Sequence, residues 1–476
     1  MPYDHSMLPT TPSARVREIL DRAPGPREEI DPPLRREIFR RVVSMGLPSM
    51  GSFLLLTVYD LIDIFWLAKI GEEPVAAVTV FGALFWVLSF PNQVIGVGSI
   101  SFISRRFGAR DEIGTELAIK NTFAGKLLAG VAVGVVGWAI CPRALTFLGA
   151  EPAVRDLGVE YGTIQWAAAG FMLASFSVYT ALRGIGRPQL GMWISVVGTV
   201  VNLGLDPLLI FGIGPFPELG VRGAALASVS GFVTVTACGL VALAHRSSPV
   251  RVRWLGGPAP GLREMLRMMW IGLPGGFSGL NFALYTSALV KLVAVYGTTV
   301  VALYGMSQQV TKVGIMVVAG LGMGAGALVG QYLGGKQLLR AWLATVSSIR
   351  LAGVTMLVFG AIVFAIAPRL VHAFFDDPAL LAPGILYLRL LAVRLPAVGV
   401  AIGVEQPFAG AGRNGPPLVL HVVSAWGVTV PVVVLLGQGL GFGPTGVMVG
   451  IVFGNLLEAV AGIWLVRRGS WLEHDL

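Results

Sequence analysis

The chain has 476 residues, of which 55% are hydrophobic and only 13% are charged, and its mean hydropathy is +0.76. A water-soluble domain carries about 25% charged residues, so this composition excludes a soluble fold. The net charge of +9 lies mostly in short gaps between long apolar stretches, which indicates charges that orient a membrane protein rather than charges that bind nucleic acid.

The chain begins with a polar segment. Residues 1 to about 32 are rich in Pro, Arg and Glu and have no continuous apolar core, so they do not resemble a signal peptide. We expect residues 1–43 to form a cytoplasmic tail, with a short interfacial helix over Arg35–Val43.

Apolar stretches follow one another from residue 44 onward. Each is long enough for the roughly 20 residues that a transmembrane helix needs, and the absence of period-two alternation excludes a β-barrel. The sequence therefore predicts an all-α membrane protein with twelve transmembrane helices. The expected spans are 44–69, 75–103, 114–140, 157–182, 189–213, 221–245, 264–295, 300–331, 341–367, 381–409, 416–437 and 445–466.

Basic residues test this topology. With the amino terminus placed inside, 24 of the 35 Lys and Arg residues fall in inside segments and 5 fall outside, the remaining 6 lying within spans. This is the bias of the positive-inside rule. We therefore expect a multi-pass protein of the cytoplasmic (inner) membrane with both termini in the cytoplasm.

The second half of the sequence repeats landmarks of the first. A shift of 226 residues without a gap places Gly46-Leu47-Pro48 on Gly272-Leu273-Pro274 and Pro142-Arg143 on Pro368-Arg369. Each half holds six spans, an even number, so the halves share one orientation. This favours two six-helix lobes related by a pseudo-two-fold axis along the membrane normal, with a cleft between them as in alternating-access transporters.

The expected domains follow from the spans and the repeat. They are a tail with the interfacial helix (1–43), an amino-terminal lobe (44–245), a basic cytoplasmic linker (246–262), a carboxy-terminal lobe (263–467) and a carboxy-terminal tail (468–476).

Five segments resemble the multidrug and toxic compound extrusion (MATE) family. They are DIFWLAKIG (63–71), SRRFGARD (104–111), ALRGIG (181–186), NLGLDPLLIFG (202–212) and LGVRGAALAS (219–228). The resemblance covers nearly the whole chain after residue 44, and it extends less closely to the wider superfamily of lipid-linked saccharide flippases.

The resemblance implies an ion-coupling site in the amino-terminal lobe. In the subgroup that this sequence is most similar to, the coupling ion binds at positions that match Asp63, Tyr161, Asn202, Asp206 and Ser228. Pro48 matches a proline at which the first helix is thought to bend. The other main subgroup keeps acids in the carboxy-terminal lobe, but here Leu289 and Val432 stand at the repeat positions of the two aspartates.

Asp63 and Asp206 carry the chemical argument. A carboxylate inside a membrane costs at least about 2.5 kcal/mol unless it is paired, hydrated or neutral, so such a pair can load and release a proton. With Asn202 it also offers oxygen ligands for Na⁺. The alternatives are a helix-start role for Asp206 before Pro207 and an interfacial position for Asp63; Asp60 either joins the cluster or faces water.

The carboxy-terminal lobe carries charges within its predicted spans, five bases against two acids: Lys291, Lys312, Arg350, Arg389, Arg394, Glu405 and Glu458. Some can reach an interface, and Arg394 with Glu405 could share one network. The same set could line a cavity for an anionic or zwitterionic substrate. The candidate substrate-cleft residues are Gln165, Lys291, Gln308, Arg394 and Glu405.

The expected function is secondary active antiport. The chain would export an organic, cationic or amphiphilic substrate in exchange for H⁺ or Na⁺, without a cofactor and as a monomer. The alternatives are a flippase for a lipid-linked saccharide and an exporter of anionic or zwitterionic metabolites on the same fold. A membrane enzyme is disfavoured, because the histidines are scattered and no metal-ligand spacing, nucleophile elbow or phosphate loop occurs.

Overall fold

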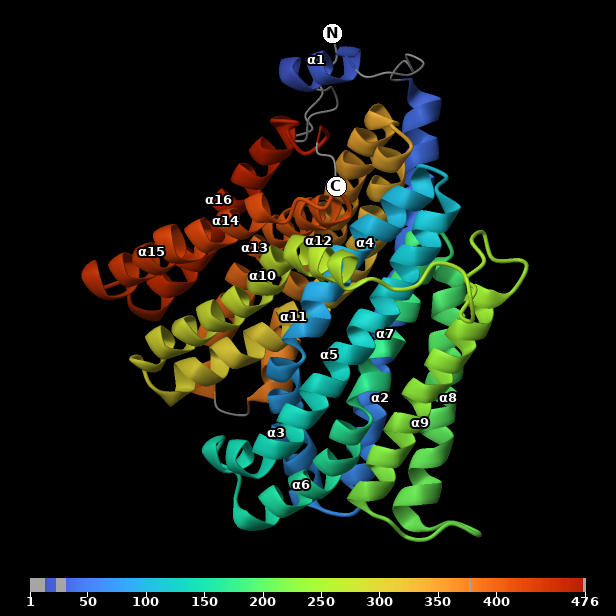
Figure 1. Cartoon of the computed structure of the whole chain (residues 1–476). Helices are drawn as coiled ribbons and strands as arrows, with labels where there is room; N and C mark the ends of the chain where they lie inside the picture. The colour runs from blue at the N-terminus through green and yellow to red at the C-terminus, as the bar shows by residue number, and fades with distance from the viewer. Residues whose placement is uncertain (1–12, 23–30, 376–377, 474–476) are drawn as a thin grey trace. The chain divides into compact units, whose positions relative to one another are not determined.

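A computed structural model describes residues 13–22, 31–375 and 378–473, and the elements within these ranges are helices (Figure 1). They are α1 (Ala14–Arg22), α2 (Pro32–Leu67), α3 (Glu72–Leu88), α4 (Phe90–Gly108), α5 (Glu112–Phe147), α6 (Pro152–Ala167), α7 (Ala169–Gly184), α8 (Pro188–Phe211), α9 (Val221–Ala244), α10 (Leu262–Ala294), α11 (Thr298–Gly334), α12 (Leu338–Phe374), α13 (Pro378–Gly410), α14 (Gly415–Val422), the π-helical η1 (Val423–Thr429), α15 (Val430–Val434), η2 (Leu435–Gly439) and α16 (Gly443–Arg467).

The helices confirm the predicted fold class. Among the described residues, 10 helices are long and apolar enough to cross a membrane, or up to 11 if α3 and α4, which meet at an angle of 50°, form one span. The predicted fourth span corresponds to two 16-residue helices, α6 and α7, which break at Ala168. The predicted eleventh span corresponds to the run from α14 to η2, whose π-helical turns widen the helix.

The internal repeat is visible in the backbone. The only non-glycine residues with positive φ in the described chain are Arg110 (φ 58°) and Lys336 (φ 56°), and they are 226 positions apart. Gly186 (φ 76°) and Gly412 (φ 72°) are related by the same shift. Left-handed backbone is uncommon outside glycine, so its recurrence at equivalent turns supports a duplicated architecture.

The chain divides into two units within which the helices pack. Unit 1 comprises Met1–Met50 and Pro274–Leu476, and unit 2 comprises Gly51–Leu273. The division falls inside α2 and α10, close to the repeat-related prolines Pro48 and Pro274. The boundaries expected from the sequence lie in the connectors instead. In the structure, unit 1 includes the first part of α2 and unit 2 includes the first part of α10.

Glycines explain why these helix segments pack where they do. In unit 1 a Cβ on Gly324 of α11 would lie 2.6 Å from the Gly46 nitrogen of α2. In unit 2 a Cβ on Gly98 of α4 would lie 1.9 Å from the Met268 carbonyl oxygen of α10, and one on Gly272 would lie 2.7 Å from the Gly98 nitrogen. Small residues allow such close backbone approach between membrane helices. The two crossings are related by the 226-residue shift.

The predicted linker lies against α5 in unit 2. Arg253 donates from its Nη2 to Glu116 Oε2 at 2.8 Å, and Lys120 Nζ donates to the Gly256 carbonyl at 2.8 Å. The Gly261 N–H donates to Asn121 Oδ1 at 2.8 Å. These bonds hold the connector along the first turns of α5.

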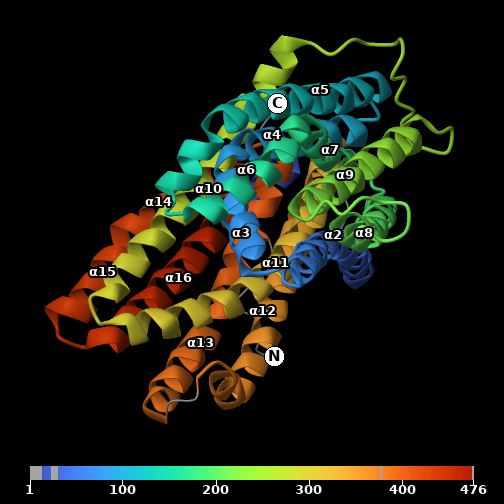
Figure 2. The same ribbon diagram turned by 90° about the horizontal axis from the view of Figure 1, so that it is seen from below.

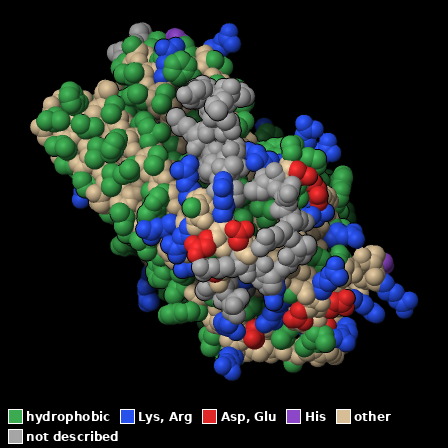
Figure 3. Space-filling model, turned by 90° about the horizontal axis from the view of Figure 1, so that it is seen from above, with side chains coloured by type: hydrophobic (Ala, Val, Ile, Leu, Met, Phe, Trp, Pro, Cys, Tyr) green, Lys and Arg blue, Asp and Glu red, His purple; other side chains and the backbone are tan. Residues whose placement is uncertain are grey.

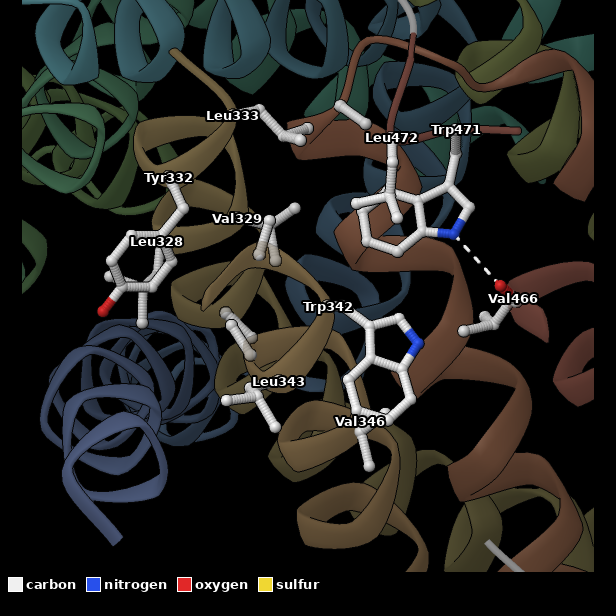
Figure 4. Close-up of a cluster of buried hydrophobic side chains, with 14 of the residues drawn as sticks. Leu328, Val329, Tyr332, Leu333, Trp342, Leu343, Val346, Val466, Trp471 and Leu472 are labelled. Carbon is white, nitrogen blue, oxygen red and sulfur yellow. Dashed lines mark hydrogen bonds between the residues drawn. The ribbon is translucent and has the colours of Figure 1, made fainter. Parts of the chain in front are cut away.

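Described residues near the two ends of the chain pack together in unit 1. Val16 and Ile19 of α1 join a buried cluster with Trp342, Trp471 and neighbouring side chains of α11, α12 and α13 (Figure 4). The indole N–H of Trp471 donates to the Val466 carbonyl at 3.3 Å. The sequence had predicted only a polar tail here. The pattern of Val16, Ile19 and Leu20 on one helical face is the signal that was missed.

The expected interfacial helix over Arg35–Val43 is not a separate element, because α2 runs without a break from Pro32 to Leu67. Of the expected tails, residues 1–12, 23–30 and 474–476 lie outside the described residues.

Basic side chains gather at one end of each unit. In unit 1 Arg340, at the start of α12, lies 3.4 Å from Glu37 near the start of α2. In unit 2 Arg106, near the end of α4, lies 2.9 Å from Glu264 near the start of α10. Figure 3 shows Lys and Arg side chains frequent on the face seen from above, and hydrophobic side chains over the flank toward the upper left.

We expect Gly98→Val and Gly324→Val each to destabilise the fold, by about 1–3 kcal/mol or more, because a branched side chain cannot fit at either helix crossing. Thermal unfolding of the purified protein in detergent measures the effect. Gly82→Ala is the control, because a Cβ on Gly82 meets nothing within 4 Å. An unfolding midpoint unchanged by both Val variants contradicts the crossing.

Trp471→Ala should lower the unfolding midpoint, because removing a fully buried indole costs about 3–5 kcal/mol. It should also speed the proteolytic loss of α1, which packs in the same cluster. Trp193→Ala, which removes a 61% exposed indole, serves as the comparison. Equal proteolysis of both variants would show that α1 does not depend on this cluster.

Candidate functional site

The candidate site is built by four helices of unit 2. Asp63 lies near the end of α2, Tyr161 on α6, Asn202 and Asp206 on α8, and Ser228 on α9. All five side chains are buried, with exposures of 0% for Asn202 and Asp206 and 6% or less for the others. Helices α8 and α9 lie side by side in both ribbon views (Figures 1 and 2).

Close packing of α8 on α9 positions the polar residues. A Cβ on Gly231 would lie 3.2 Å from the Gly198 carbonyl oxygen, 3.4 Å from Asn202 Cβ and 3.5 Å from the Tyr59 ring. A Cβ on Gly198 would lie 2.5 Å from Val235. The two glycines therefore let the helices approach until Asn202 reaches the acids of both α2 and α8.

Asn202 bridges the two carboxylates. Its amide Nδ2 donates to Asp63 Oδ1 at 3.1 Å and to Asp206 Oδ1 at 3.4 Å, and Ser228 Oγ donates to Asp63 Oδ2 at 2.8 Å. The Asn202 amide has two N–H donors, so one side chain links both acids. The structure thus brings together four of the predicted coupling residues by direct hydrogen bonds.

The acid pair lacks a compensating charge. No Lys, Arg or His in the described chain forms an ion pair with Asp63 or Asp206. Asp206 Oδ2 and Asn202 Oδ1 are buried without a hydrogen-bond partner in the same part of the chain. Buried carboxylates are normally paired or coordinate a cation, so these free oxygens leave positions for a proton or a small hard cation.

Tyrosines border the pair. Tyr161 accepts a hydrogen bond from Gln165 Nε2 at 2.8 Å, and its hydroxyl lies within electrostatic reach of Asp63 and Ser228. The Tyr59 hydroxyl has the same two neighbours and is buried without a partner among the described residues. Tyr59 was not predicted, although it stands one helical turn before Asp63 on the same face.

Several alternatives are resolved by the helix bounds. Asp206 and Pro207 lie inside α8, so Asp206 does not cap a helix start. Pro207 cannot donate to the carbonyl four residues earlier, which loosens the helix next to the acid. Asp60 is exposed, whereas Asp63 is 5% exposed. Pro48 lies within the uninterrupted α2, just before the chain passes from unit 1 to unit 2.

The predicted substrate-cleft residues fall into separate groups. Gln165 packs against Tyr161 in unit 2. In unit 1 Gln308 Oε1 accepts from Arg394 Nη2 at 3.0 Å, whereas Glu405 lies 3.7 Å from His421 and not with Arg394 as the sequence had suggested. Lys291 is exposed.

The donor set fits a hard cation or a proton better than a transition metal. The described residues contain no cluster of three or more His, Cys, Asp or Glu side chains that could hold a metal ion. Carboxylate, amide and hydroxyl oxygens suit hard cations, and two buried acids share a proton readily.

Comparison with known proteins identifies the family and the fold. The MatE family model matches residues 48–208 and 274–435, two segments that begin 226 residues apart. The chain is 27% identical over 429 residues to the "Probable multidrug resistance protein YoeA" of Bacillus subtilis, covering 87% of this chain and 90% of that protein.

Solved structures share the fold. "Crystal structure of MATE in the bent conformation" matches with a TM-score of 0.83 at 25% identity, covering 96% of this chain and 97% of that one. "Reverse polarity of binding pocket suggests different function of a MOP superfamily transporter from Pyrococcus furiosus" matches with a TM-score of 0.82 at 25% identity, covering 92% and 97%. With both repeats matched by one family model and the fold shared along nearly its whole length, the chain belongs to the MatE family of membrane transporters.

Proposed function

We propose that this protein is a secondary active antiporter that exports organic, drug-like substrates in exchange for H⁺ or Na⁺. The names of relatives such as the YoeA protein support the substrate class. The carrying observation is the acid pair of Asp63 and Asp206, buried without a basic partner and bridged by Asn202.

The coupling step rests on charge compensation. When the site is empty, the charged Asp206 carboxylate is stabilised by contact with water. A bound cation or proton neutralises that charge, so the loaded and empty forms favour different arrangements of α2, α8 and α9. A bound ion shifts an equilibrium only through its different affinity for two states. The states in question are the outward-open and inward-open arrangements of alternating access.

Helix α2 offers a route from the site to the remainder of the chain. Asp63 lies in its unit 2 segment, while Gly46 in its unit 1 segment packs against Leu321 and Gly324 of α11. A change in tilt at Asp63 therefore acts on contacts of the same helix in unit 1. Pro48 lies between Gly46 and Asp63, near the end of the unit 1 segment, where a missing backbone hydrogen bond lowers the cost of bending.

The proposal includes the location and orientation of the protein. It lies in the cytoplasmic membrane with both termini inside and acts as a monomer on a small-molecule substrate. It belongs to the subgroup with its ion site in the amino-terminal lobe. The basic ends of both units support this orientation. The arginines in the carboxy-terminal half keep an anionic or zwitterionic substrate as the second candidate. One structural neighbour, the transporter from Pyrococcus furiosus, is described by a reverse polarity of its binding pocket.

We expect Asp63→Asn and Asp206→Asn each to reduce gradient-driven efflux of a cationic dye from proteoliposomes to the leak of protein-free vesicles, because an amide neither carries the negative charge that a cation compensates nor takes up and releases a proton near neutral pH. Asp156→Asn is the matched control, since Asp156 is exposed and pairs with Arg155. Efflux by both site variants at the rate of the control variant would refute the coupling site.

The nature of the ion is tested by imposing pH and Na⁺ gradients separately on vesicles containing the unmodified protein. If the site is proton-coupled, dye transport responds to the pH gradient alone and stops when an ionophore collapses that gradient. A sodium-coupled site responds to Na⁺ at constant pH. Dye movement that ignores both gradients contradicts antiport altogether.

A further inference from the structure

We propose that Arg394 is the binding site for a carboxylate group of the transported substrate, so that the substrate class includes anionic and zwitterionic amphiphiles. The inference rests on the proposed transport function, and it concerns a cluster in unit 1 that is separate from the acid pair. The cluster consists of Arg394 on α13, Gln308 and Thr311 on α11, Asn455 on α16, and Tyr285 and Tyr304.

Arg394 is held by neutral groups alone. Its Nη1 donates to Asn455 Oδ1 at 3.2 Å, and its Nη2 donates to Gln308 Oε1 at 3.0 Å and Thr311 Oγ1 at 3.3 Å. The side chain is 8% exposed, and its Nε is buried without a partner among the described residues. Three oxygens thus fix the guanidinium in place without neutralising its charge.

The nearest acids are already engaged. Glu458, one turn beyond Asn455 on α16, pairs with His421, and Glu405 lies 3.7 Å from the same imidazole. No carboxylate of the described chain lies within ion-pair distance of Arg394. Because a buried charge without an opposite charge is costly, an external anion is the partner that this arrangement lacks.

Two tyrosines add unused donors. The hydroxyls of Tyr285 and Tyr304 are buried without a partner in the described chain, and both lie within electrostatic reach of Arg394. A planar guanidinium with nearby O–H groups matches the two oxygens of a carboxylate. Gln308, Asn455 and Tyr285 are half-buried, so the cluster reaches the surface of its unit.

The internal repeat relates one residue of this cluster, Tyr285, to a tyrosine beside the acid pair of the first half. Under the 226-residue shift Tyr59 falls on Tyr285, while Asp63 and Asp206 fall on Leu289 and Val432. Arg394 falls on Ala168, the residue between α6 and α7. The repeat therefore keeps a tyrosine at equivalent positions, while the buried charge differs in both sign and position between the two halves.

One positive charge favours a monoanion. A phosphate monoester carries between one and two negative charges at neutral pH and would remain undercompensated by a single arginine with neutral neighbours. A carboxylate carries one charge and two acceptor oxygens, so it uses the guanidinium and the hydroxyls without excess.

The test uses two fluorescent probes that differ only in their terminal group, a carboxylate in dansylglycine and a neutral amide in dansylglycinamide. Binding to the purified full-length protein is measured without any ion gradient. We expect the carboxylate probe to bind at least about 10-fold more tightly than the amide. Arg394→Gln should reduce this preference to less than about 2-fold, and Arg394→Lys should retain part of it. Arg389→Gln, at an exposed arginine of the same helix that stacks on Phe364, should retain all of it.

Equal binding of both probes to the unmodified protein would overturn the proposal, as would a full preference in Arg394→Gln. If Arg394→Gln does not fold, Tyr285→Phe and Tyr304→Phe decide the question. Each should lower the preference about 3-fold, and an unchanged preference in both overturns it. A carboxylate preference without gradient-driven transport would leave this site in place while refuting the antiport function, and dye efflux without the preference would do the reverse.

Discussion

The structure depends on the cost of keeping an ionisable group away from water. Asp63 and Asp206 are held in a nearly solvent-free environment by one amide and one hydroxyl, with no basic side chain of the described chain to offset them. Such a pair is costly inside a bundle of apolar helices, and under the proposed function a mobile cation or proton supplies the missing charge for part of the time. The same principle applies with opposite sign around Arg394, where neutral oxygens orient a guanidinium but leave its charge uncompensated.

The two halves use the repeat in different ways. Helix crossings, turns with left-handed backbone and buried tyrosines recur at equivalent positions, as Gly98 with Gly324 and Arg110 with Lys336 illustrate. These features are set by close packing and backbone geometry, which a duplicated chain must satisfy twice. Charged residues are not constrained in this way, so the first half could specialise in acids and the second in a base.

Much of the fold could be predicted from the sequence because the bilayer imposes a simple rule on helix length and polarity. The predicted spans coincide with α8 to α11, α13 and α16 within about three residues of each end, whereas α2 begins 12 residues earlier than predicted and α5 and α12 each extend 7 residues further. The break at Ala168 could not be predicted, since neither a proline nor a glycine occupies it. The docking of α1 was missed because only a short stripe, Val16, Ile19 and Leu20, carries the signal within a polar tail.

The candidate site was accessible to sequence reasoning mainly through family resemblance. Spacing alone placed Asn202 and Asp206 on one face of a helix, but only the folded structure brings Ser228 and Asp63 into contact across 165 positions. The hydrogen-bond partners of Arg394 come from two helices distant in the sequence, α11 and α16, and no local pattern distinguishes Asn455 or Gln308 from Glu405 as its neighbour. Partner identity inside a bundle depends on helix rotation, which hydropathy does not encode.

The division of α2 and α10 between the units has a consequence for how such a protein assembles. Residues 262–273 of α10 pack with unit 2, and residues 32–50 of α2 pack with unit 1. Each half of the polypeptide therefore supplies a segment to the bundle formed by the other half. A chain severed in the 246–262 connector would leave two fragments that each display an unfilled glycine-lined groove. Neither fragment has a complete interior of its own, and the two can regain it only by reciprocal exchange of their leading helices.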